Sequence, residues 1–315
     1  MLKSLTTRHA AWSVGVFTSE SPTIEASGDP VLLLDSRRLL RAPWAIRIRA
    51  DPFLLVADDR LYMFIETQIG DRPGTISAYV TDDLSDWRPL GTILAEPFHL
   101  SYPQVFAIGG RHYLMPEARR SGQLRLYRFE RFPDELVLER VLLDAPITDP
   151  TPFHHQGMWY LFATIGDTLR LFVTDDLVAG ELRPHPAGII ETRKDYRRNG
   201  GPIIERGGRL YRLSQAHRHR YGDHLCLFEI ERLTPDAYRE TLVCDDLPFP
   251  AFDWSRDGCH HSSAVWFRDR WVTAIDGQVA DFYIHKITDR AGAWLIDAWS
   301  AACRSVHAVL RRSAF

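Results

Sequence analysis

The sequence predicts an all-β fold, a five-bladed β-propeller with a short C-terminal helix. Three observations lead to this prediction: one short phrase recurs five times, the copies are about 50 residues apart, and further strand-like runs follow each copy. In each copy two runs of β-forming residues flank a polar turn, which is the pattern of a β-hairpin. The copies are ADPFLLVADDRLYMFIE, SYPQVFAIGGRHYLMPEA, TDPTPFHHQGMWYLFAT, GGPIIERGGRLYRLSQA and HHSSAVWFRDRWVTAIDG.

Each hairpin is followed by a third strand-like run, and most are followed by a fourth. The third runs include TISAYVTDD and TLRLFVTDD, and the fourth runs include GTILAE and LVLERVLL. Four antiparallel strands in each unit are typical of a propeller blade. We therefore expect the propeller to span residues 49–290.

The two ends of the chain complete this architecture. The fifth unit has too few strands for a blade of its own. We expect the N-terminal segment, residues 1–48, to close that blade with the run WSVGVF or the run DPVLLL, which would remove two exposed sheet edges. Residues 291–315 carry apolar side chains near helical spacing and predict one terminal helix.

The composition is that of a soluble globular protein. Of the 315 residues, 45% are hydrophobic and 25% are charged, and the formal net charge of −3 argues against a general nucleic-acid binder. No run is long enough for a membrane-spanning helix, and the N-terminus lacks the apolar core of a secretory signal. We therefore expect a cytoplasmic protein with no nucleic-acid partner and no transmembrane segment.

The repeat aligns ten positions at the mouth of the expected central channel. The innermost strand of a blade begins near the channel, and the second strand returns to the same face. Half of the ten positions are acidic, which predicts a polar ligand site, although single acids at strand ends also serve as caps. The first-strand positions are Asp51, Tyr102, Asp149, Gly201 and His261, and the second-strand positions are Glu66, Glu117, Thr164, Gln215 and Asp276.

Carboxylates that crowd into one cleft have a chemical consequence. Mutual repulsion and partial desolvation raise the pKa of some members of the group. A pair of carboxyl groups with separated pKa values is what acid–base chemistry on a glycosidic bond requires. The ionised member activates water or attacks directly, and the protonated member donates to the leaving oxygen.

Several of these motifs resemble those of a known protein family. A propeller whose first blade opens with Asp-Pro is similar to the arabinanase, levansucrase and invertase superfamily, which includes glycoside hydrolase family 43. More specifically, ADPF, HLSYPQVF, YLMPEA, LRLYRFERFP and NGGPIIERGGRLYR resemble the N-terminal domain of plant glucosamine inositolphosphorylceramide transferase. The resemblance covers roughly residues 40–280. It implies a carbohydrate-active propeller associated with glycosyltransferases and with polysaccharide or glycolipid biosynthesis.

The resemblance also implies roles for three acidic residues. Asp51 matches the catalytic base of the glycosidase superfamily, and Asp149 in TDPTPF matches the second aspartate, which tunes the acid and orients the sugar. The third member is a glutamate that acts as general acid, and here the sequence departs, because the fourth unit opens with RRNGGP. Glu117 is the best replacement, and Glu66 is the next candidate.

Histidines and arginines surround the same positions. His217 follows Gln215 and is expected to bind a sugar hydroxyl or a phosphate, although His217, His219 and His224 together would also suit a metal ion. His260 and His261 lie at the channel mouth, where related glycosidases can carry an axial ion. We expect no cofactor apart from such an axial calcium ion, and hydrogen bonding to backbone is the alternative role for these histidines.

A basic run precedes the fourth unit. Arg198 and Asn199 in KDYRRNGG would overhang the funnel, where an arginine binds phosphate or carboxylate through two parallel bonds. A solvated loop is the alternative. Arginines beside carboxylates fit an anionic sugar conjugate better than a neutral glycan.

Three hypotheses about function follow. The first is an enzyme with Asp51 as base or nucleophile, Asp149 as modulator and Glu117 (or Glu66) as acid. The second is a glycan-binding module without catalysis, and the third is a propeller that transfers a sugar from an activated donor. In all three, Glu66, Tyr102, Arg198, Asn199, Gln215, His217, His260, His261 and Asp276 are expected to contact the ligand.

Overall fold

The structure is a computed structural model that describes residues 6–20, 28–37, 46–190, 196–217, 221–249 and 252–285, without the side chains of residues 6–9 and 280–285. The predicted terminal helix over residues 291–315 lies outside this part of the chain, as does His219. Almost all regular structure in the described ranges is β-strand, and helical structure is limited to short turns such as η2 (Arg119–Ser121). Within these ranges no helix has the length and apolar character that would let it span a bilayer.

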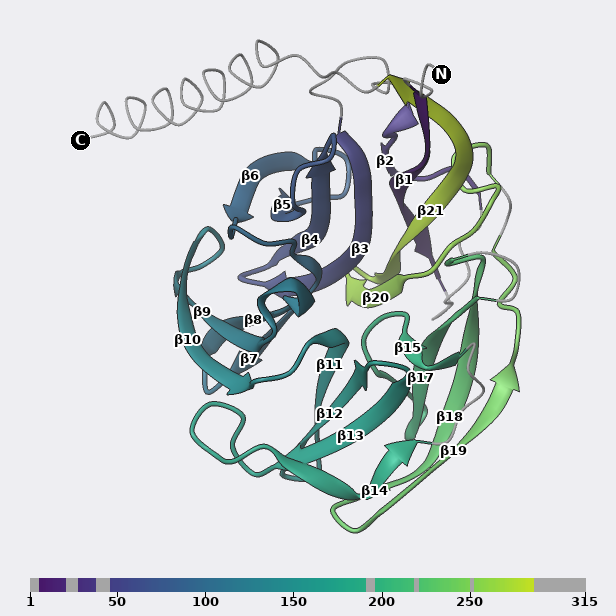
Figure 1. The fold of residues 1–315 in the computed structure, drawn as a ribbon. Helices are drawn as coiled ribbons and strands as arrows, with labels where there is room; N and C mark the ends of the chain where they lie inside the picture. Colours follow the sequence, from purple (N-terminus) through teal and green to yellow (C-terminus); the bar gives the residue numbers. More distant parts are fainter. Residues whose placement is uncertain are drawn as a thin grey trace, which may run out of the picture.

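The strands form sheets arranged around a common centre, as in a β-propeller (Figure 1). Three sheets each follow the chain in order. They consist of β7 (Ser101–Ile108), β8 (Arg111–Glu117), β9 (Leu124–Arg131) and β10 (Glu135–Leu143); of β11 (Ile147–His155), β12 (Met158–Ile165), β13 (Thr168–Thr174) and β14 (Arg183–Ile190); and of β15 (Arg198–Asn199), β16 (Ile204–Arg206), β17 (Arg209–Ala216), β18 (His224–Thr234) and β19 (Ala237–Cys244).

A fourth, eight-stranded sheet joins the two ends of the described chain. One half comprises β3 (Ile46–Ala57), β4 (Arg60–Ile69), β5 (Thr75–Thr81) and β6 (Arg88–Leu94), and the other comprises β20 (Ser262–Phe267), β21 (Arg270–His285), β1 (Thr6–Ser19) and β2 (Leu32–Leu34). The halves meet through a parallel pairing of Trp12 with Ile48. WSVGVF in β1 pairs with β21, and LLL of DPVLLL in β2 pairs with β1. Because hydrogen bonding is continuous across the two halves, the number of five blades stays a prediction.

One turn type closes the hairpin of every repeat. Both central residues of each turn have positive φ, which is the signature of the two-residue type I′ hairpin whose twist matches that of the strands. The turns are Asp58–Asp59, Gly109–Gly110, Gln156–Gly157, Gly207–Gly208 and Arg268–Asp269. The five copies of the phrase therefore share one local structure.

Three inner strands also share a β-bulge at the residue that the repeat aligned. Asp51, Tyr102 and Asp149 have φ values of 52°, 48° and 47°, and the strand register shifts next to each of them. A left-handed residue in a bulge re-aims its side chain and bends the strand. Such strained backbone persists where the surrounding structure fixes it, and it concentrates at functional sites.

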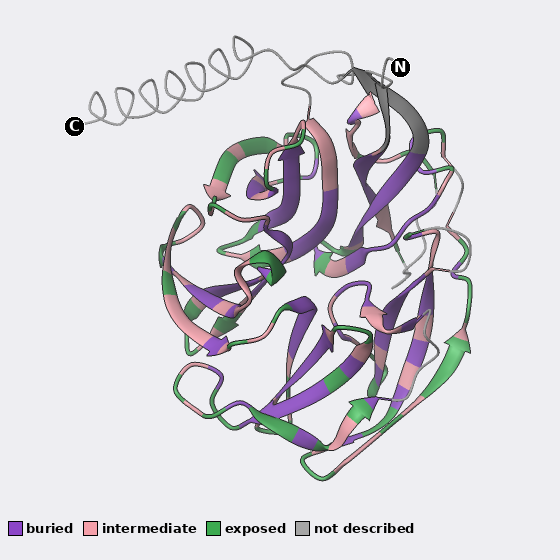
Figure 2. Cartoon of the chain, in the orientation of Figure 1, coloured by how far each residue is buried: buried purple, intermediate pink, exposed green. Residues whose placement is uncertain are grey.

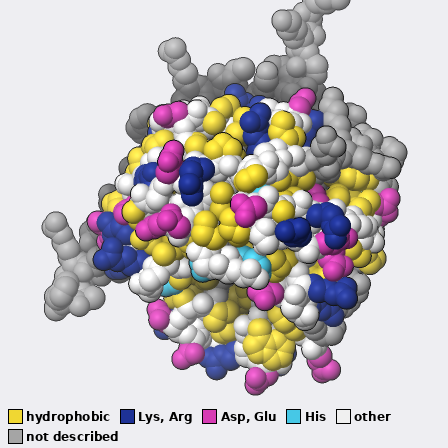
Figure 3. Space-filling model, turned by 90° about the horizontal axis from the view of Figure 1, so that it is seen from below, with side chains coloured by type: hydrophobic (Ala, Val, Ile, Leu, Met, Phe, Trp, Pro, Cys, Tyr) yellow, Lys and Arg dark blue, Asp and Glu magenta, His cyan; other side chains and the backbone are white. Residues whose placement is uncertain are grey.

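The hydrophobic core lies between neighbouring sheets. Phe64 on β4, Leu114 on β8 and Tyr127 on β9 belong to one buried cluster, and Met115 and Leu161 belong to the next. Figure 2 shows buried residues along the inner strands and more exposed residues along the outer strands. On the face shown in Figure 3, acidic and basic side chains are interspersed with hydrophobic ones. Packing between sheets thus holds the inner strands, and with them the aligned positions, in place.

Candidate functional site

A cavity of about 220 Å3 lies where the aligned strand ends meet. We call it the funnel cavity. Three acidic side chains and three basic ones share its wall with nonpolar and aromatic groups. Its lining residues are Trp12, Ile48, Ala50, Asp51, Glu66, His99, Ser101, Glu117, Arg198, Tyr221 and His260. Of the predicted site residues, Asp51, Glu66, Glu117, Arg198 and His260 line it, whereas the others lie behind its wall.

The carboxylates of the site also hold the bulged strand starts. The backbone N–H of Asp51 donates to Asp276 (3.2 Å), and that of Tyr102 donates to Asp51 (3.1 Å). The N–H of Asp149 donates to Glu117 (3.1 Å). These bonds join β3 to β21, β7 to β3 and β11 to β8. The acids therefore link neighbouring strands at the centre of the molecule, and the same bonds fix the positions of their carboxylates.

Asp149 lies behind the cavity wall, where Arg198 covers it. Arg198 donates from Nε and NH2 to the two oxygens of Asp149, at 2.6 and 3.0 Å, and Gln215 donates a third bond (3.0 Å). Asn199 donates to the backbone oxygen of Asp149 (2.9 Å). The side chain of Asp149 is 1% exposed. Asp149, Asn199 and Gln215 therefore act on a ligand only through the groups that they position.

Glu117 has the environment of a general acid. Burial is the largest cause, and the charge of Asp149 the next, of a pKa raised from 4.5 to about 7, although Arg198 opposes both. The NH2 of Arg198 lies 3.9 Å from Glu117 Oε2. A carboxyl group with a pKa near 7 is protonated in part at neutral pH and can donate a proton to a leaving oxygen.

Asp51 is a second buried carboxyl group that lines the funnel cavity. Burial raises its pKa well above the ordinary value, the charge of His260 lowers it, and Glu66 and Asp276 add repulsion. Its Oδ2 accepts the N–H of Tyr102, whereas its Oδ1 is buried without a hydrogen bond among the described residues. Oδ1 is thus an acceptor that a ligand hydroxyl would satisfy.

Glu66 lies next to His99 on the cavity wall. His99 Nδ1 accepts the N–H of Gly74 (2.9 Å), so its Nε2 carries the proton that faces Glu66 Oε1 at 3.2 Å. Burial disfavours charge on His99, but the bond to Glu66 outweighs it and raises the pKa of the imidazole. Glu66 is therefore paired with His99, which favours Glu117 over Glu66 as the acid.

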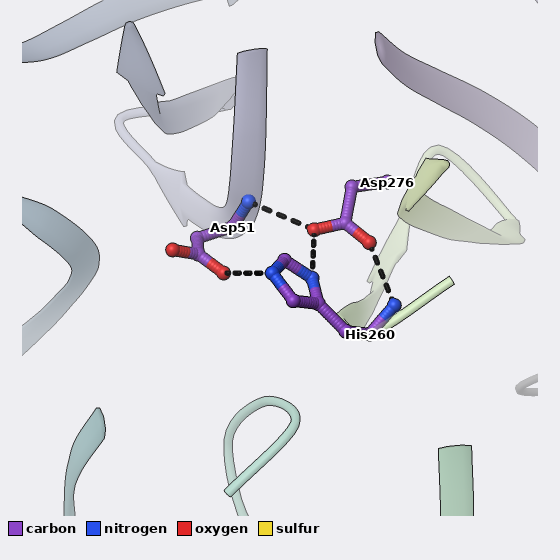
Figure 4. A group of neighbouring side chains, drawn as sticks. All are labelled: Asp51, His260 and Asp276. Carbon is purple, nitrogen blue, oxygen red and sulfur yellow. Dashed lines mark hydrogen bonds and ion pairs between the residues drawn. The ribbon is translucent and has the colours of Figure 1, made fainter. Parts of the chain in front are cut away.

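His260, Asp276 and Asp51 form a second buried cluster (Figure 4). Asp276 accepts the N–H groups of His260 (2.9 Å) and His261 (3.1 Å), and His260 Nδ1 lies 2.6 Å from its Oδ2. The ring of His261 is fully buried, and burial lowers its pKa to about 3. His261 is therefore neutral, and the cation of this cluster is His260.

An axial calcium ion, which the resemblance to the glycosidases implies, does not fit this cluster. Its ligand atoms lie within 4.8 Å of one another, but both oxygens of Asp276 already accept N–H donors. His260 Nδ1 faces the same carboxylate. Asp51 Oδ1 is the one carboxylate oxygen of these three residues that accepts no N–H group of the described residues. Calcium, in contrast, takes six to eight oxygen ligands.

Tyr102 crosses the centre of the molecule from β7. Its hydroxyl lies 2.9 Å from Thr151 Oγ1, donates to the backbone oxygen of Gly201 (2.9 Å) and accepts the N–H of Gly201 (3.0 Å). A Cβ on Gly201 would lie 2.1 Å from the backbone oxygen of Ser262. This contact explains why the fourth repeat opens without an acid, since no side chain fits at that position.

Aromatic side chains form one wall of the funnel cavity. Tyr221 lies under the guanidinium of Arg198, 5.1 Å from the ring centre, and its ring stacks on His217 at 5.1 Å. Burial, helped by Arg198, lowers the pKa of His217 to about 4, and its Nδ1 accepts the N–H of Gly222. Neutral His217 thus supports Tyr221 rather than lining the cavity.

The prediction from sequence missed Trp12, His99 and Tyr221. Trp12 lies in WSVGVF, which we expected only to close a blade, and His99 precedes the second repeat by two residues. Tyr221 follows the histidines of SQAHRHRYGDH, which offered the only local signal for it. All three come from segments outside the repeated phrase, so the alignment of the copies could not identify them.

The fold is shared with carbohydrate-active enzymes of known structure. The chain is similar to an exo-1,5-α-L-arabinanase from a bovine ruminal metagenomic library, with a TM-score of 0.53 at 14% identity over 77% of this chain and 99% of that one. It is also similar to a thermostable family-43 glycoside hydrolase, with a TM-score of 0.53 at 18% identity over 77% and 94%. These likenesses confirm the propeller fold.

Sequence comparison identifies the family. The chain is 34% identical to glucosamine inositolphosphorylceramide transferase 1 of Arabidopsis thaliana over 74% of this chain, and 32% identical to that of Oryza sativa subsp. indica over 85%. It spans only 34% and 40% of the length of these relatives. The family model described as "Glucosamine inositolphosphorylceramide transferase 1, N-terminal" matches residues 6–278. The chain therefore belongs to the family of the N-terminal domain of glucosamine inositolphosphorylceramide transferase 1.

Proposed function

We propose that the funnel cavity binds one sugar of a glycan or glycoconjugate and carries out chemistry on its glycosidic bond. The observation that carries this proposal is the convergence of Asp51, Glu66 and Glu117 on one cavity, together with the pKa of Glu117 near 7. A buried acid and a second carboxylate on one wall are the parts that glycosidic-bond chemistry needs.

In this proposal Asp51 is the base or nucleophile and Glu117 is the acid. Glu117 donates its proton to the leaving oxygen as the glycosidic bond breaks, and Asp51 takes the proton of the attacking hydroxyl or attacks the sugar itself. Asp149 tunes Glu117 through two contacts: it donates its backbone N–H to Glu117, and its negative charge raises the pKa of that group. Arg198 pairs with the Asp149 carboxylate in this role.

Arg198 gives the cavity its preference among ligands. Two of its guanidinium nitrogens bind Asp149, which leaves NH1 outside that pair. A phosphate or carboxylate on the ligand would suit NH1, because charge-assisted bonds to arginine are strong in partly buried sites. This supports an anionic sugar conjugate as the ligand.

Transfer of the sugar, rather than hydrolysis, is a second form of the same proposal. The curated relatives are named transferases, and this chain covers about a third of their length. In this form the attacking hydroxyl belongs to an acceptor molecule and the funnel cavity holds the donor sugar. Asp51 and Glu117 keep their roles as base and acid.

Recognition without catalysis is the alternative, and one observation favours it. The fourth repeat has no acid at its first strand, and a side chain there would collide with Ser262. The funnel cavity would then recognise a glycan in polysaccharide or glycolipid biosynthesis. Its aromatic wall and its hydrogen-bonding groups would serve binding alone.

Two variants separate these functions. The wild type, Asp51→Asn and Glu117→Gln are incubated with a panel of glycans, sugar nucleotides and glycolipids, and both turnover and binding are measured. We expect both variants to lose turnover by a factor of about 100 or more while ligand binding persists. Asp59→Asn, in the exposed turn of the same hairpin as Asp51, is the matched control. Binding without turnover in the wild type would support recognition alone.

A further inference from the structure

The ring of His260 is packed closely against Trp12 and Gly222. Trp12 stacks on it with ring centres 4.0 Å apart and an angle of 23° between the planes. Gly222 lies next to both rings, and a Cβ there would approach Trp12 Cη2 to 2.8 Å, His260 Cβ to 3.0 Å and His260 Cδ2 to 3.1 Å. The residue is 3% exposed. His260 therefore presents its two nitrogens in fixed directions.

Those directions connect two carboxylates. Nδ1 lies 2.6 Å from Asp276 Oδ2, and Nε2 lies 3.9 Å from Asp51 Oδ1 (Figure 4). Asp276 in turn accepts the backbone N–H groups of His260, His261 and Asp51. The Asp276 carboxylate is thus saturated and immobile, whereas Asp51 Oδ1 has no hydrogen bond among the described residues.

We propose that His260, held by Asp276, is a positioning residue for Asp51 whose positive charge favours the ionised form of the Asp51 carboxylate. This inference rests on the proposed function in one respect, the role of Asp51 as base. The charge coupling between His260 and Asp51 can be measured without any activity.

The arrangement of charges around Asp51 explains why it needs this cation. The acidic groups that face it are Glu66 on β4, Asp149 on β11 and Asp276 on β21. Among the described residues, Arg198 is a further cation close to His260. Its guanidinium is already bonded to the Asp149 carboxylate. His261 lies 3.7 Å from Asp51 Oδ1 but is neutral. An isolated buried carboxylate would take up a proton instead of staying charged.

His260 has a defined part in the step in which Asp51 acts as base. The proton of the attacking hydroxyl moves to Asp51 as the oxygen of that hydroxyl forms the new bond to the sugar, while the glycosidic bond breaks and its leaving oxygen takes the proton of Glu117. His260 keeps its own protons throughout, so it does not serve as a relay. Its effect is to lower the pKa of Asp51 before the step, which sets the acidic limb of the pH profile.

Nitrogen-15 NMR of the histidines tests the coupling. His260 is assigned by its loss in His260→Gln and is titrated in the wild type, Asp51→Asn and Asp276→Asn. We expect the pKa of His260 to fall by at least one unit in Asp276→Asn and by at least half a unit in Asp51→Asn. His112→Gln, on β8 beside Phe132, is the control for the loss of a histidine. If His260 titrates in Asp51→Asn as in the wild type, the proposal is wrong.

Two further outcomes are decisive. If Asp276→Asn does not fold, the comparison of Asp51→Asn with the wild type still tests the proposal, because the proposal concerns the coupling between His260 and Asp51. A saturable shift of the His260 Nε2 resonance on addition of calcium chloride would overturn the proposal in favour of a metal ligand.

Activity adds a second readout. In His260→Gln the pKa of Asp51 rises, so the acidic limb of the turnover profile moves to higher pH by about one unit; an unmoved limb contradicts the proposal. If no glycan is turned over and the NMR coupling is present, the proposed function fails and the positioning role stands.

Discussion

Arg198 and Asp149 form a two-bonded ion pair behind the wall of the funnel cavity, with distances of 2.6 Å from Nε to Oδ2 and 3.0 Å from NH2 to Oδ1. The pair joins β15 to the bulge of β11. It places a positive charge on the cavity wall and a negative charge next to Glu117. The same ion pair therefore stabilises the contact between β15 and β11 and influences the protonation of Glu117.

Loss of Arg198 is expected to destabilise the protein strongly. Arg198→Met leaves the buried Asp149 carboxylate without its cation, and breaking a buried pair costs about 3 kcal/mol or more. Arg131→Met is the matched control, because Arg131 is 52% exposed and surface ion pairs such as its pair with Asp134 contribute little to stability. Urea unfolding measures both. Equal losses in the two variants would contradict the structural role of the pair.

Glu117 is expected to make stability depend on pH. Because its pKa is about 7 in the folded protein against an ordinary 4.5, the folded state binds this proton more tightly. The stabilisation is full below pH 4.5 and is lost as the pH rises through 7. At about 1.4 kcal/mol for each pKa unit, the effect is on the order of 3 kcal/mol.

Glu117→Gln isolates this contribution. The free energy of unfolding of the wild type is expected to fall between pH 5 and pH 8 relative to that of Glu117→Gln. Chemical unfolding at the two pH values measures the difference. A difference that is the same at both values would mean that the pKa of Glu117 is ordinary.

Gly201 is expected to tolerate no side chain. In Gly201→Ala the new Cβ would meet the oxygen of Ser262 at 2.1 Å, so backbone must move and a loss above about 3 kcal/mol is expected. Gly157→Ala is the control, since its φ is 80° but no atom lies within 4 Å of its Cβ. It is expected to cost about 1–2 kcal/mol from backbone strain alone. Thermal unfolding compares them, and similar losses would count against the close approach at Gly201.

The hairpins of this fold follow from local sequence. Alternating strand runs around pairs such as Gly109–Gly110 and Gly207–Gly208 specify type I′ turns without tertiary information. The register of each copy then places Asp51 and Glu117 at strand ends near the centre. That much is visible in the chain because it depends on spacing and turn chemistry.

Other properties of the site depend on contacts between distant segments. The burial of Asp149 results from Arg198, 49 residues further along the chain, and the close packing of His260 results from Trp12 and Gly222. The left-handed backbone of Tyr102 is held by a bond to Asp51. No local sequence pattern predicts contacts between such distant residues. The sequence therefore indicated the acidic residues but not which of them face the cavity.

The central claim is that Asp51 and Glu117 act together on a sugar in the funnel cavity. The most direct measurement is the rate of glycosidic bond cleavage or transfer by the wild type, Asp51→Asn, Glu117→Gln and Asp59→Asn on a ligand that all four bind. We expect the two cavity variants to lose at least a hundredfold in rate with ligand affinity within about threefold, and we expect Asp59→Asn to be unchanged. Equal rates in all four proteins would contradict it.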